Sequence, residues 1–401
     1  MLAFTARRLL TPDGIIEHAV MVVDDGRVLE IVPRAEGRLA TGASHVDFGD
    51  AVIAPGYVDL HIHGSGGFDV MDDRAEALPA IERVLARHGV TSYFPTTVTA
   101  PMESTLRALE RLADAIEAGG GTSQQQSTGQ KTAGERIVGA GRAVPLGIHL
   151  EGPFISHARR GVHPTENLLP PRIETFERFW QASRGHIRMM TMAPELEGAV
   201  ELIGAAAARG VCVSLGHSDA DFAATERAID AGARHSTHVF NAMRPLGHRD
   251  PGILGAVLTD ERVSADMIAD GIHLDPAIVK LVAKAKGREL VLITDATAAA
   301  GMPDGRYRLG SMEVDVKDGV CSFDGKLAGS VLTMDRAVRN LAQFAGWSVS
   351  ESVSAASRNP ARVAGCGGKG VLSAGADADF LVLNEEGEVL RTFIGGVEAV
   401  S

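Results

Sequence analysis

Apolar runs alternate with amphipathic stretches through the central part of the chain. The stretches between the runs repeat their apolar residues with helical spacing, as at Ala75–His88, Met102–Ala118, Leu196–Arg209 and Asp219–Ala231. Strands that alternate with helices over this length predict a parallel (β/α)₈ barrel, with a doubly wound open sheet as the structural alternative. The eight expected strands are 57–63, 90–96, 144–151, 187–193, 211–217, 234–239, 262–268 and 289–295.

The two ends of the chain have a different pattern, typical of short antiparallel strands. Near the N-terminus, Asp25-Gly26 separates two apolar runs, which is a strong hairpin signal. The C-terminal segment is similar, with a strand-like run at Val389–Ile394 after a Glu-Gly turn. We therefore expect both ends to form one small β-sandwich domain, beside a catalytic barrel. The expected boundaries are 1–54 and 359–401 for the β domain and 55–358 for the barrel.

One segment, at about 119–135, breaks the alternation. It begins GGGTSQQQ and contains almost no apolar residues. Such a composition is typical of a flexible insertion. Because it joins a helix to the next strand, we expect it on the barrel face opposite the active site.

Charge and cysteine content narrow the classes of function. The 401 residues include 39 Lys and Arg against 51 Asp and Glu, a net charge of −12. This balance argues against nucleic acid or an anionic membrane as the main partner. Three distant cysteines without a CxxC motif favour a reducing compartment. With no run of ~20 apolar residues and no export pattern at the start, we expect a soluble cytoplasmic protein.

Polar residues that can bind metal stand at the ends of the predicted strands. His61 and His63 end the first strand, and their i, i+2 spacing places both side chains on one face. In a barrel the carboxyl ends of all strands meet at one rim, where catalytic groups lie. Imidazole and carboxylate ligands suit zinc, iron(II) or another divalent first-row metal. The other strand-end candidates are Glu151, His217, His238 and Asp295.

These positions allow one or two metal sites. Glu151, His217 and His238 make a site of two histidines and one carboxylate, and His61 with His63 could complete a second site nearby. Each residue alone is a weak signal, since a single strand-end histidine is more often structural. The joint pattern carries the inference.

In order along the chain, seven motifs resemble those of the N-acetylglucosamine-6-phosphate deacetylases, a branch of the amidohydrolase superfamily. The motifs are PGYVDLHIHG, HLEGPF, RRGVHP, GHSDA, THVFNAM, IADGIH and ITDATAAAGMPDG. The resemblance covers nearly the whole chain. It implies a metal-dependent barrel with a small β domain built from both termini, and hydrolysis of the acetamide of an amino-sugar phosphate.

The resemblance also implies roles for individual residues. Glu151, His217 and His238 match the main metal ligands, His61 and His63 match a pair that binds a second metal in some members, and Asp295 matches the catalytic aspartate. His163 matches the residue that contacts the acetyl carbonyl. Family dimers further imply a homodimer, in which His273 reaches the phosphate at the neighbouring site. The remaining matched sugar-phosphate contacts are Asn241, Ala242 and Arg249.

Parts of the sequence also allow other functions. GHSDA resembles a serine nucleophile elbow, with Asp270 and His273 following in the chain order of a triad. That interpretation leaves the other strand-end histidines unexplained, and we expect Ser218 to cap the helix that starts at Asp219 instead. A non-enzymatic relative would have lost its ligand set. Ring opening or deamination in the same superfamily stays possible, although Glu151 and THVFNAM argue against it.

Overall fold

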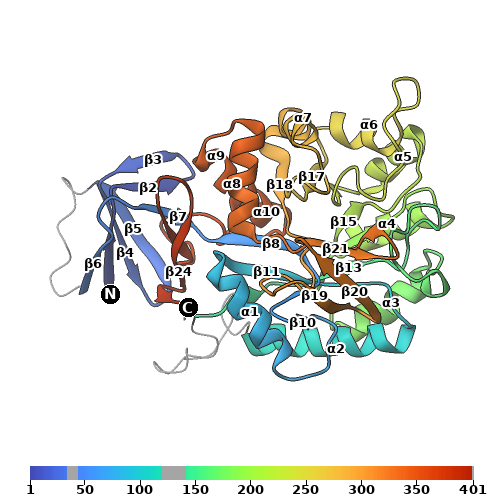
Figure 1. Ribbon diagram of the computed structural model, residues 1–401, viewed down its shortest axis with the longest axis horizontal. Helices are drawn as coiled ribbons and strands as arrows, with labels where there is room; N and C mark the ends of the chain where they lie inside the picture. The colour runs from blue at the N-terminus through green and yellow to red at the C-terminus, as the bar shows by residue number, and fades with distance from the viewer. Residues whose placement is uncertain (34–43, 120–140, 400–401) are drawn as a thin grey trace.

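The computed structural model describes residues 1–33, 44–119 and 141–399, and a parallel barrel forms its larger part, on the right in Figure 1. Its strands pair in parallel around the barrel, and a bridge between Ile62 and Ala296 brings the first strand to the end of the last. An open sheet has no such closing contact, so the barrel is confirmed. The strands are β8 (Tyr57–Ile62), β11 (Val90–Thr97), β12 (Val144–Pro145) with β13 (Ile148–Glu151), β14 (Ile187–Met192), β15 (Cys212–Leu215), β16 (His235–Ser236), β17 (Ser264–Met267) and β18 (Leu290–Leu292).

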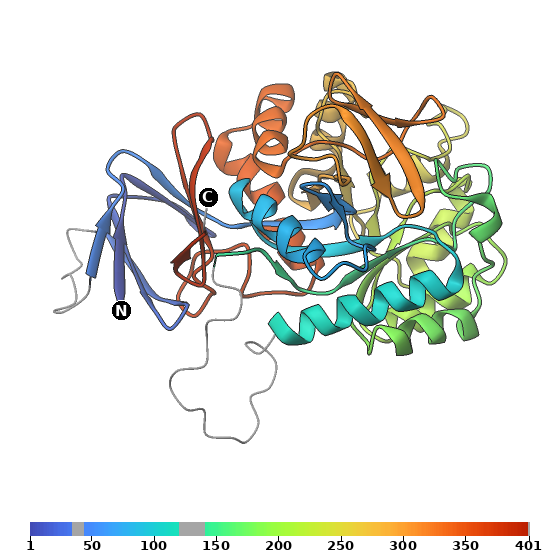
Figure 2. The same ribbon diagram turned by 60° about the horizontal axis from the view of Figure 1, so that its bottom comes forward.

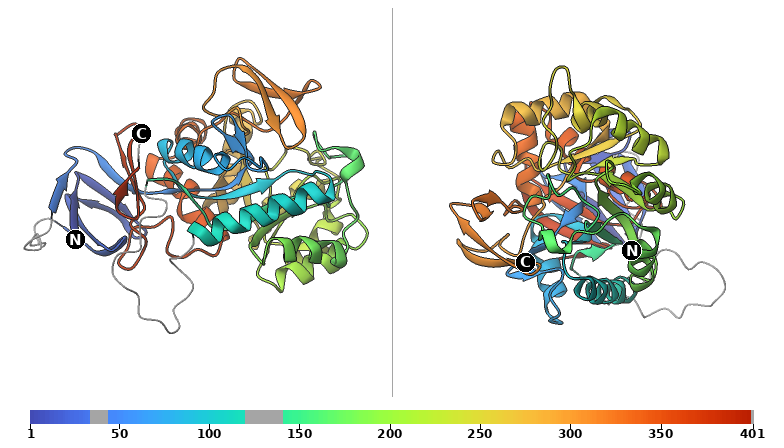
Figure 3. Two further views of the ribbon diagram at one scale, coloured as in Figure 1. Left: turned by 90° about the horizontal axis from the view of Figure 1, so that it is seen from below. Right: turned by 90° about the vertical axis from the view of Figure 1, so that its right-hand side faces the viewer.

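Helices surround the strands, as Figures 2 and 3 show. Local signals set several of their ends: the Asp275 side chain accepts from the Ala277 amide at the start of α7, and Pro276 occupies its first turn. The expectation for Ser218 was wrong, because the next helix begins later, at Phe222, and Asp221 caps it. The helices are α1 (Ala77–Arg87), α2 (Met102–Gly119), α3 (Ile173–Ala182), α4 (Ala199–Ala207), α5 (Phe222–Ala231), α6 (Gly252–Thr259), α7 (Pro276–Lys286), α8 (Met334–Ala345), α9 (Val349–Ala356) and α10 (Arg358–Val363).

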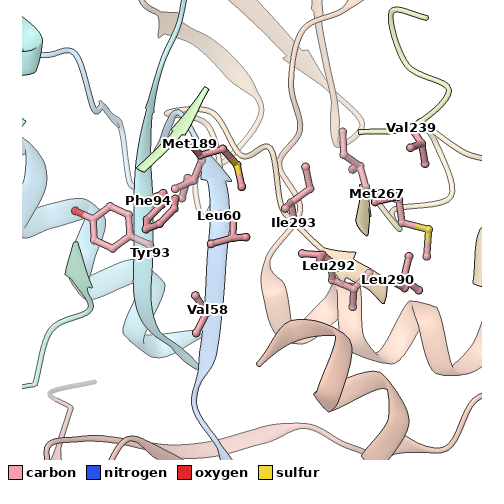
Figure 4. Packing of buried hydrophobic residues seen from close by; sticks show 14 of the residues in the cluster. Val58, Leu60, Tyr93, Phe94, Met189, Val239, Met267, Leu290, Leu292 and Ile293 are labelled. Atoms are coloured by element: carbon pink, nitrogen blue, oxygen red, sulfur yellow. The ribbon is translucent and has the colours of Figure 1, made fainter. Parts of the chain in front are cut away.

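The barrel strands are buried on both faces, which explains why they read as continuous apolar runs. Every residue of β8, β11, β14 and β18 except Arg188 is buried. Figure 4 shows side chains of one continuous cluster filling this region, including Leu60, Phe94 and Met189. This packing holds the strand ends, and the side chains they carry, in fixed positions.

The two chain ends meet in one sheet beside the barrel. β7 (Val52–Pro55) pairs antiparallel with β23 (Phe380–Leu383) and in parallel with β2. A second sheet packs against the first through Phe4, which contacts the stacked rings of Phe380 and Phe393. Sheets built from both termini were expected, whereas the exact domain boundaries stay a prediction. The remaining strands are β1 (Leu2–Thr5), β2 (Arg8–Thr11), β3 (Gly14–Glu17), β4 (Ala19–Asp24), β5 (Arg27–Pro33), β6 (Ser44–Asp47), β24 (Val389–Ile394) and β25 (Val397–Glu398).

A small antiparallel sheet, which the sequence analysis did not predict, follows the last barrel strand. It stands out from the barrel in Figure 3. An apolar cluster that includes Val98, Ala299, Leu309 and Val314 joins it to the barrel rim. Its strands are β19 (Gly305–Leu309), β20 (Met312–Lys317), β21 (Val320–Phe323) and β22 (Lys326–Leu327), and two short strands, β9 (Gly64–Ser65) and β10 (Phe68–Asp69), lie near it.

Two further expectations concern the low-complexity insertion and membrane-spanning helices. The insertion expected at about 119–135 lies, beyond Gly119, outside the described residues. Among the helices of the described ranges, none combines the length and the apolar character that crossing a bilayer requires.

A half-buried ion network joins the segment before β23 to Arg27 of β5. The ammonium of Lys369 lies 2.6 Å from Asp379 Oδ2 and 2.9 Å from Asp377 Oδ2, and Arg27 contacts the other oxygen of Asp377 at 3.0 Å. Burial alone would lower the pKa of Lys369, but the two carboxylates raise it. The lysine charge therefore neutralises carboxylates that little water can reach.

Lys369→Met is expected to destabilise the protein, because it leaves the carboxylate of Asp379 buried without its cation. The free energy of unfolding should fall by roughly 3–5 kcal/mol, measured by urea denaturation. The control is Lys326→Met, at an exposed position on β22. Equal unfolding midpoints for the two variants would contradict this account of the network.

Candidate metal centre and active site

All six strand-end candidates come together at the carboxyl end of the barrel, and all six are buried. They form two groups of three, each with its ligand atoms within 4.8 Å of one another. Five of the six line one cavity of about 170 Å³, together with His163. The first group is Glu151, His217 and His238, and the second is His61, His63 and Asp295.

Glu151 lies between the two groups. Its Oε1 is 3.2 Å from Nε2 of both His217 and His238. Its Oε2 is 3.2 Å from Nε2 of His63. The Nε2 atoms of His61 and His63 lie 3.5 and 3.3 Å from Asp295 Oδ1. One carboxylate can therefore contribute an oxygen to each group.

The histidine rings turn their Nε2 atoms toward Glu151. Nδ1 of His217 is 3.0 Å from the Arg159 carbonyl, and Nδ1 of His63 is 3.0 Å from the Thr96 carbonyl. A carbonyl only accepts, so each Nδ1 carries a proton and Nε2 faces Glu151. In the neutral ring, which is the form that binds a metal, this Nε2 offers its lone pair.

Nitrogen and carboxylate oxygen atoms that face one another at this distance are held together by positive charge, supplied either by a proton on the imidazole or by a bound cation. Nitrogen and oxygen ligands that bind one tetrahedral metal at about 2.0–2.2 Å are themselves about 3.3–3.6 Å apart. The separation of 3.1 Å between the Nε2 atoms of His217 and His238 is close to this value. The donor set and its spacing thus fit a divalent metal.

The acid–base properties of the cluster depend on the charge of Glu151. Burial would raise the pKa of Glu151, but the imidazoles around it hold it well below its usual range. Burial lowers the pKa of His217 to about 4, whereas the Glu151 carboxylate outweighs burial at His238 and raises that pKa to about 9. Neighbouring imidazoles, His61 first, also lower the pKa of Asp295 against the effect of burial. Both carboxylates are therefore ionised at neutral pH.

His163 lies on the same cavity, and a threonine orients it. Its Nδ1 accepts the Thr99 backbone N–H at 3.4 Å and lies 2.8 Å from Thr99 Oγ1. In a neutral ring this places the proton on Nε2, which lies 3.6 Å from Glu151 Oε2. A Cβ on Gly152 would lie 2.2 Å from Thr99 Oγ1, so only glycine leaves room for this contact. Sequence reasoning missed Thr99, and no local motif marks it.

Three of the strand-end residues adopt the left-handed backbone conformation, which is rare outside glycine. His217, His238 and Asp295 have φ of 48°, 27° and 48°. Such strain costs of order 1–3 kcal/mol per residue and persists where surrounding contacts impose it. The Asp266 carboxylate accepts the His238 backbone N–H, and the Asp295 amide donates to the His61 carbonyl at 2.9 Å. Asp266 was also missed, although an acid at a predicted strand end was a visible signal.

The predicted substrate contacts divide into two sets. Asn241, Ala242 and His273 line the cavity of their own chain. Asp270 accepts a hydrogen bond from Nδ1 of His273 at 2.7 Å, which fixes the ring and leaves Nε2 for a ligand. Arg249 is exposed and is not among the residues that line the cavity.

The serine-hydrolase alternative lacks its geometry. Ser218 Oγ donates to the Glu195 carboxylate at 2.7 Å, and His273 is paired with Asp270. Within the described part of the chain, no histidine forms a hydrogen bond with Ser218, so no base is placed to activate it.

A closed parallel barrel with two adjoining groups of histidine and carboxylate ligands at its carboxyl rim defines a class of metal-dependent hydrolase, and the amidohydrolase family model matches residues 52–399. The chain belongs to the amidohydrolase family.

Its relatives place it more narrowly. The N-acetylglucosamine-6-phosphate deacetylase of Bos taurus is 38% identical over 99% of this chain and 95% of its own length. The N-acetylgalactosamine-6-phosphate deacetylase of Escherichia coli O157:H7 is 37% identical over 98% of this chain and 97% of its own. A mutant N-acetyl-D-glucosamine-6-phosphate deacetylase from Mycobacterium smegmatis, in complex with N-acetyl-D-glucosamine-6-phosphate, superposes with a TM-score of 0.89. It is 34% identical and covers 100% of this chain and 99% of its own.

Glu151→Gln is expected to lower metal content at both groups, because an amide supplies no negative charge to offset the cation. His63→Asn should lower it at the second group alone. The measurement is metal per chain after zinc loading and dialysis, with Glu174→Gln as the control at an exposed position. Undiminished metal content in Glu151→Gln would show that this carboxylate does not hold the ion.

Proposed function

We propose that this chain hydrolyses the acetamide of N-acetylglucosamine 6-phosphate to glucosamine 6-phosphate and acetate, in amino-sugar metabolism. The observation that carries the proposal is the Glu151 carboxylate between two metal-competent groups, with Asp295 and His163 on the same cavity. Relatives matched along almost the whole chain carry the names of amino-sugar phosphate deacetylases, which supports the choice of substrate.

The two groups would hold one or two divalent metals, with zinc or iron the best match to nitrogen and oxygen ligands. Glu151, His217 and His238 would hold the first, and His61, His63 and Asp295, with the second oxygen of Glu151, the other. When bound, such a metal lowers the pKa of water toward about 7 and polarises a carbonyl.

Asp295 is the proposed general base. Its carboxylate is ionised because neighbouring imidazoles lower its pKa, and it lines the cavity. It would take the proton from the attacking water and return it to the nitrogen of the amino sugar as the carbon–nitrogen bond breaks. Acetate and the free amine are then the two products.

His163 is the proposed donor to the acetyl oxygen. The Thr99 contact leaves the proton on Nε2, the nitrogen on the Glu151 side of the ring. A donor positioned for the developing oxyanion is worth roughly 2.7–4 kcal/mol of barrier. Because Thr99 holds the ring before substrate arrives, this donor needs no reorganisation.

For the phosphate we propose His273, together with Asn241 and Ala242. The resemblance implied that His273 serves a neighbouring subunit, but it lines the cavity of its own chain, so we assign it to that chain's substrate. A homodimer and a cytoplasmic location remain part of the proposal, the latter supported by three free cysteines. The assignment of Arg249 to the phosphate stays a prediction.

Asp295→Asn is expected to lower acetate release by roughly 10²–10⁴-fold, because the amide cannot accept the water proton. The measurement is acetate release from N-acetylglucosamine 6-phosphate by zinc- or iron-loaded protein, with metal at the Glu151 group retained. Asp13→Asn, at an exposed position near the N-terminus, is the control.

The same assay tests the substrate. Unphosphorylated N-acetylglucosamine and N-acetylgalactosamine 6-phosphate serve as comparison substrates. Near-normal turnover by Asp295→Asn would remove this residue from the role, and no release from any of the three sugars would refute the proposed function.

His273→Ala is expected to raise KM for the phosphorylated sugar by about tenfold or more, the loss of one hydrogen bond to a charged group. KM for the unphosphorylated sugar should hardly change. Mixing His273→Ala chains with Asp295→Asn chains should not return KM for the phosphorylated sugar toward the wild-type value if His273 serves its own site. Restoration in the mixture would instead establish that His273 acts across subunits.

A further inference from the structure

The active-site cavity has an apolar side that the proposed mechanism does not use. Val98, Val162 and Leu309 line the cavity and belong to, or pack against, a single hydrophobic cluster. Val98 and Leu309 are each only 2% exposed. The other large apolar residue on the cavity, Leu327, is 38% exposed and stands at its outer edge.

This apolar side adjoins the proposed carbonyl donor. Val98 directly precedes Thr99, whose backbone N–H and hydroxyl contact Nδ1 of His163. Val162 directly precedes His163 itself. Because these apolar residues and His163 line one cavity, a carbonyl whose oxygen contacts His163 would have this surface within reach of its acyl substituent.

Contacts from the small sheet hold the surface in place. A Cβ on Gly310 would lie 2.4 Å from Val98 Cγ1, which shows how closely the turn between β19 and β20 packs on Val98. The Gly310 amide donates to Asp69 Oδ2 at 2.7 Å, and Leu309 pairs with Met312 across the turn. The anchored turn packs against Val98 and limits the room for Val98 to move away from the cavity.

We propose that Val98, Val162 and Leu309 form an acyl-selecting wall, which receives the methyl group of the N-acetyl substituent and excludes longer acyl chains. The inference rests on the proposed function and extends it to the choice of acyl group. An extra methylene in a close-fitting apolar pocket changes kcat/KM by roughly 10–200-fold, so the wild type should favour acetyl over propionyl and butyryl by at least about tenfold.

The test compares kcat/KM for N-acetyl-, N-propionyl- and N-butyrylglucosamine 6-phosphate in metal-loaded wild type and variants. Val98→Ala and Leu309→Ala should each raise the propionyl-to-acetyl ratio by about tenfold, since each opens space beside His163. Val314→Ala is the matched control: it removes the same kind of bulk from the same cluster, but Val314 is not among the cavity-lining residues. Its ratio should equal that of the wild type.

The outcomes separate this inference from the function on which it rests. An active Val98→Ala or Leu309→Ala with an unchanged acyl ratio, or an equal shift in Val314→Ala, overturns the wall while leaving the deacetylase intact. A wild type that releases no acyl group from any of these substrates refutes the proposed function itself. Should Val98→Ala fail to fold, Val162→Leu tests the converse, with an expected further loss of propionyl turnover relative to acetyl.

Discussion

The carboxylate of Glu151 is buried among imidazoles, and the carboxyl end of the barrel is arranged around its charge. Burying an ionised carboxylate without compensation is very costly. Here Oε1 contacts His217 and His238, and Oε2 contacts His63. The backbone carbonyls of Arg159 and Thr96 accept from Nδ1 of His217 and His63, so Nε2 of both rings faces Glu151. Positive charge at this centre, from protonated imidazole or from a bound cation, offsets the buried carboxylate, which is the physical reason that the site suits a metal.

The barrel fixes the positions of the side chains around Glu151. Each ligand stands at or just beyond the end of a strand that is packed on both faces, so its position is fixed by the core. Closure of the barrel brings Asp295 beside His61, a contact between residues more than two hundred positions apart. The left-handed conformations of His217, His238 and Asp295 are the cost of aiming three side chains inward from the loops that follow the strands.

The other parts of the molecule modify this centre in different ways. The small sheet reaches the cavity through Leu309, Leu327 and the Val98 contact, and it shapes the space in which an acyl group would lie. The loop after β17 contributes His273, held by Asp270. Among the described residues of the two sheets that the termini build, none lines the cavity. We thus propose that separate elements around one cavity carry the chemistry and the selectivity.

Local patterns in the sequence determined the eight strands, the surrounding helices and the strand-end histidines and carboxylates, because periodicity and i, i+2 spacing depend only on neighbours in the chain. The joint position of Glu151, His217 and His238 followed once a barrel was assumed. Thr99, Asp266 and the apolar surface of Val98 and Leu309 were not predictable in this way. Their roles arise from contacts between distant segments. Likewise, only the tertiary structure placed His273 on its own cavity and Arg249 outside it, since such placement depends on how loops pack after the barrel closes.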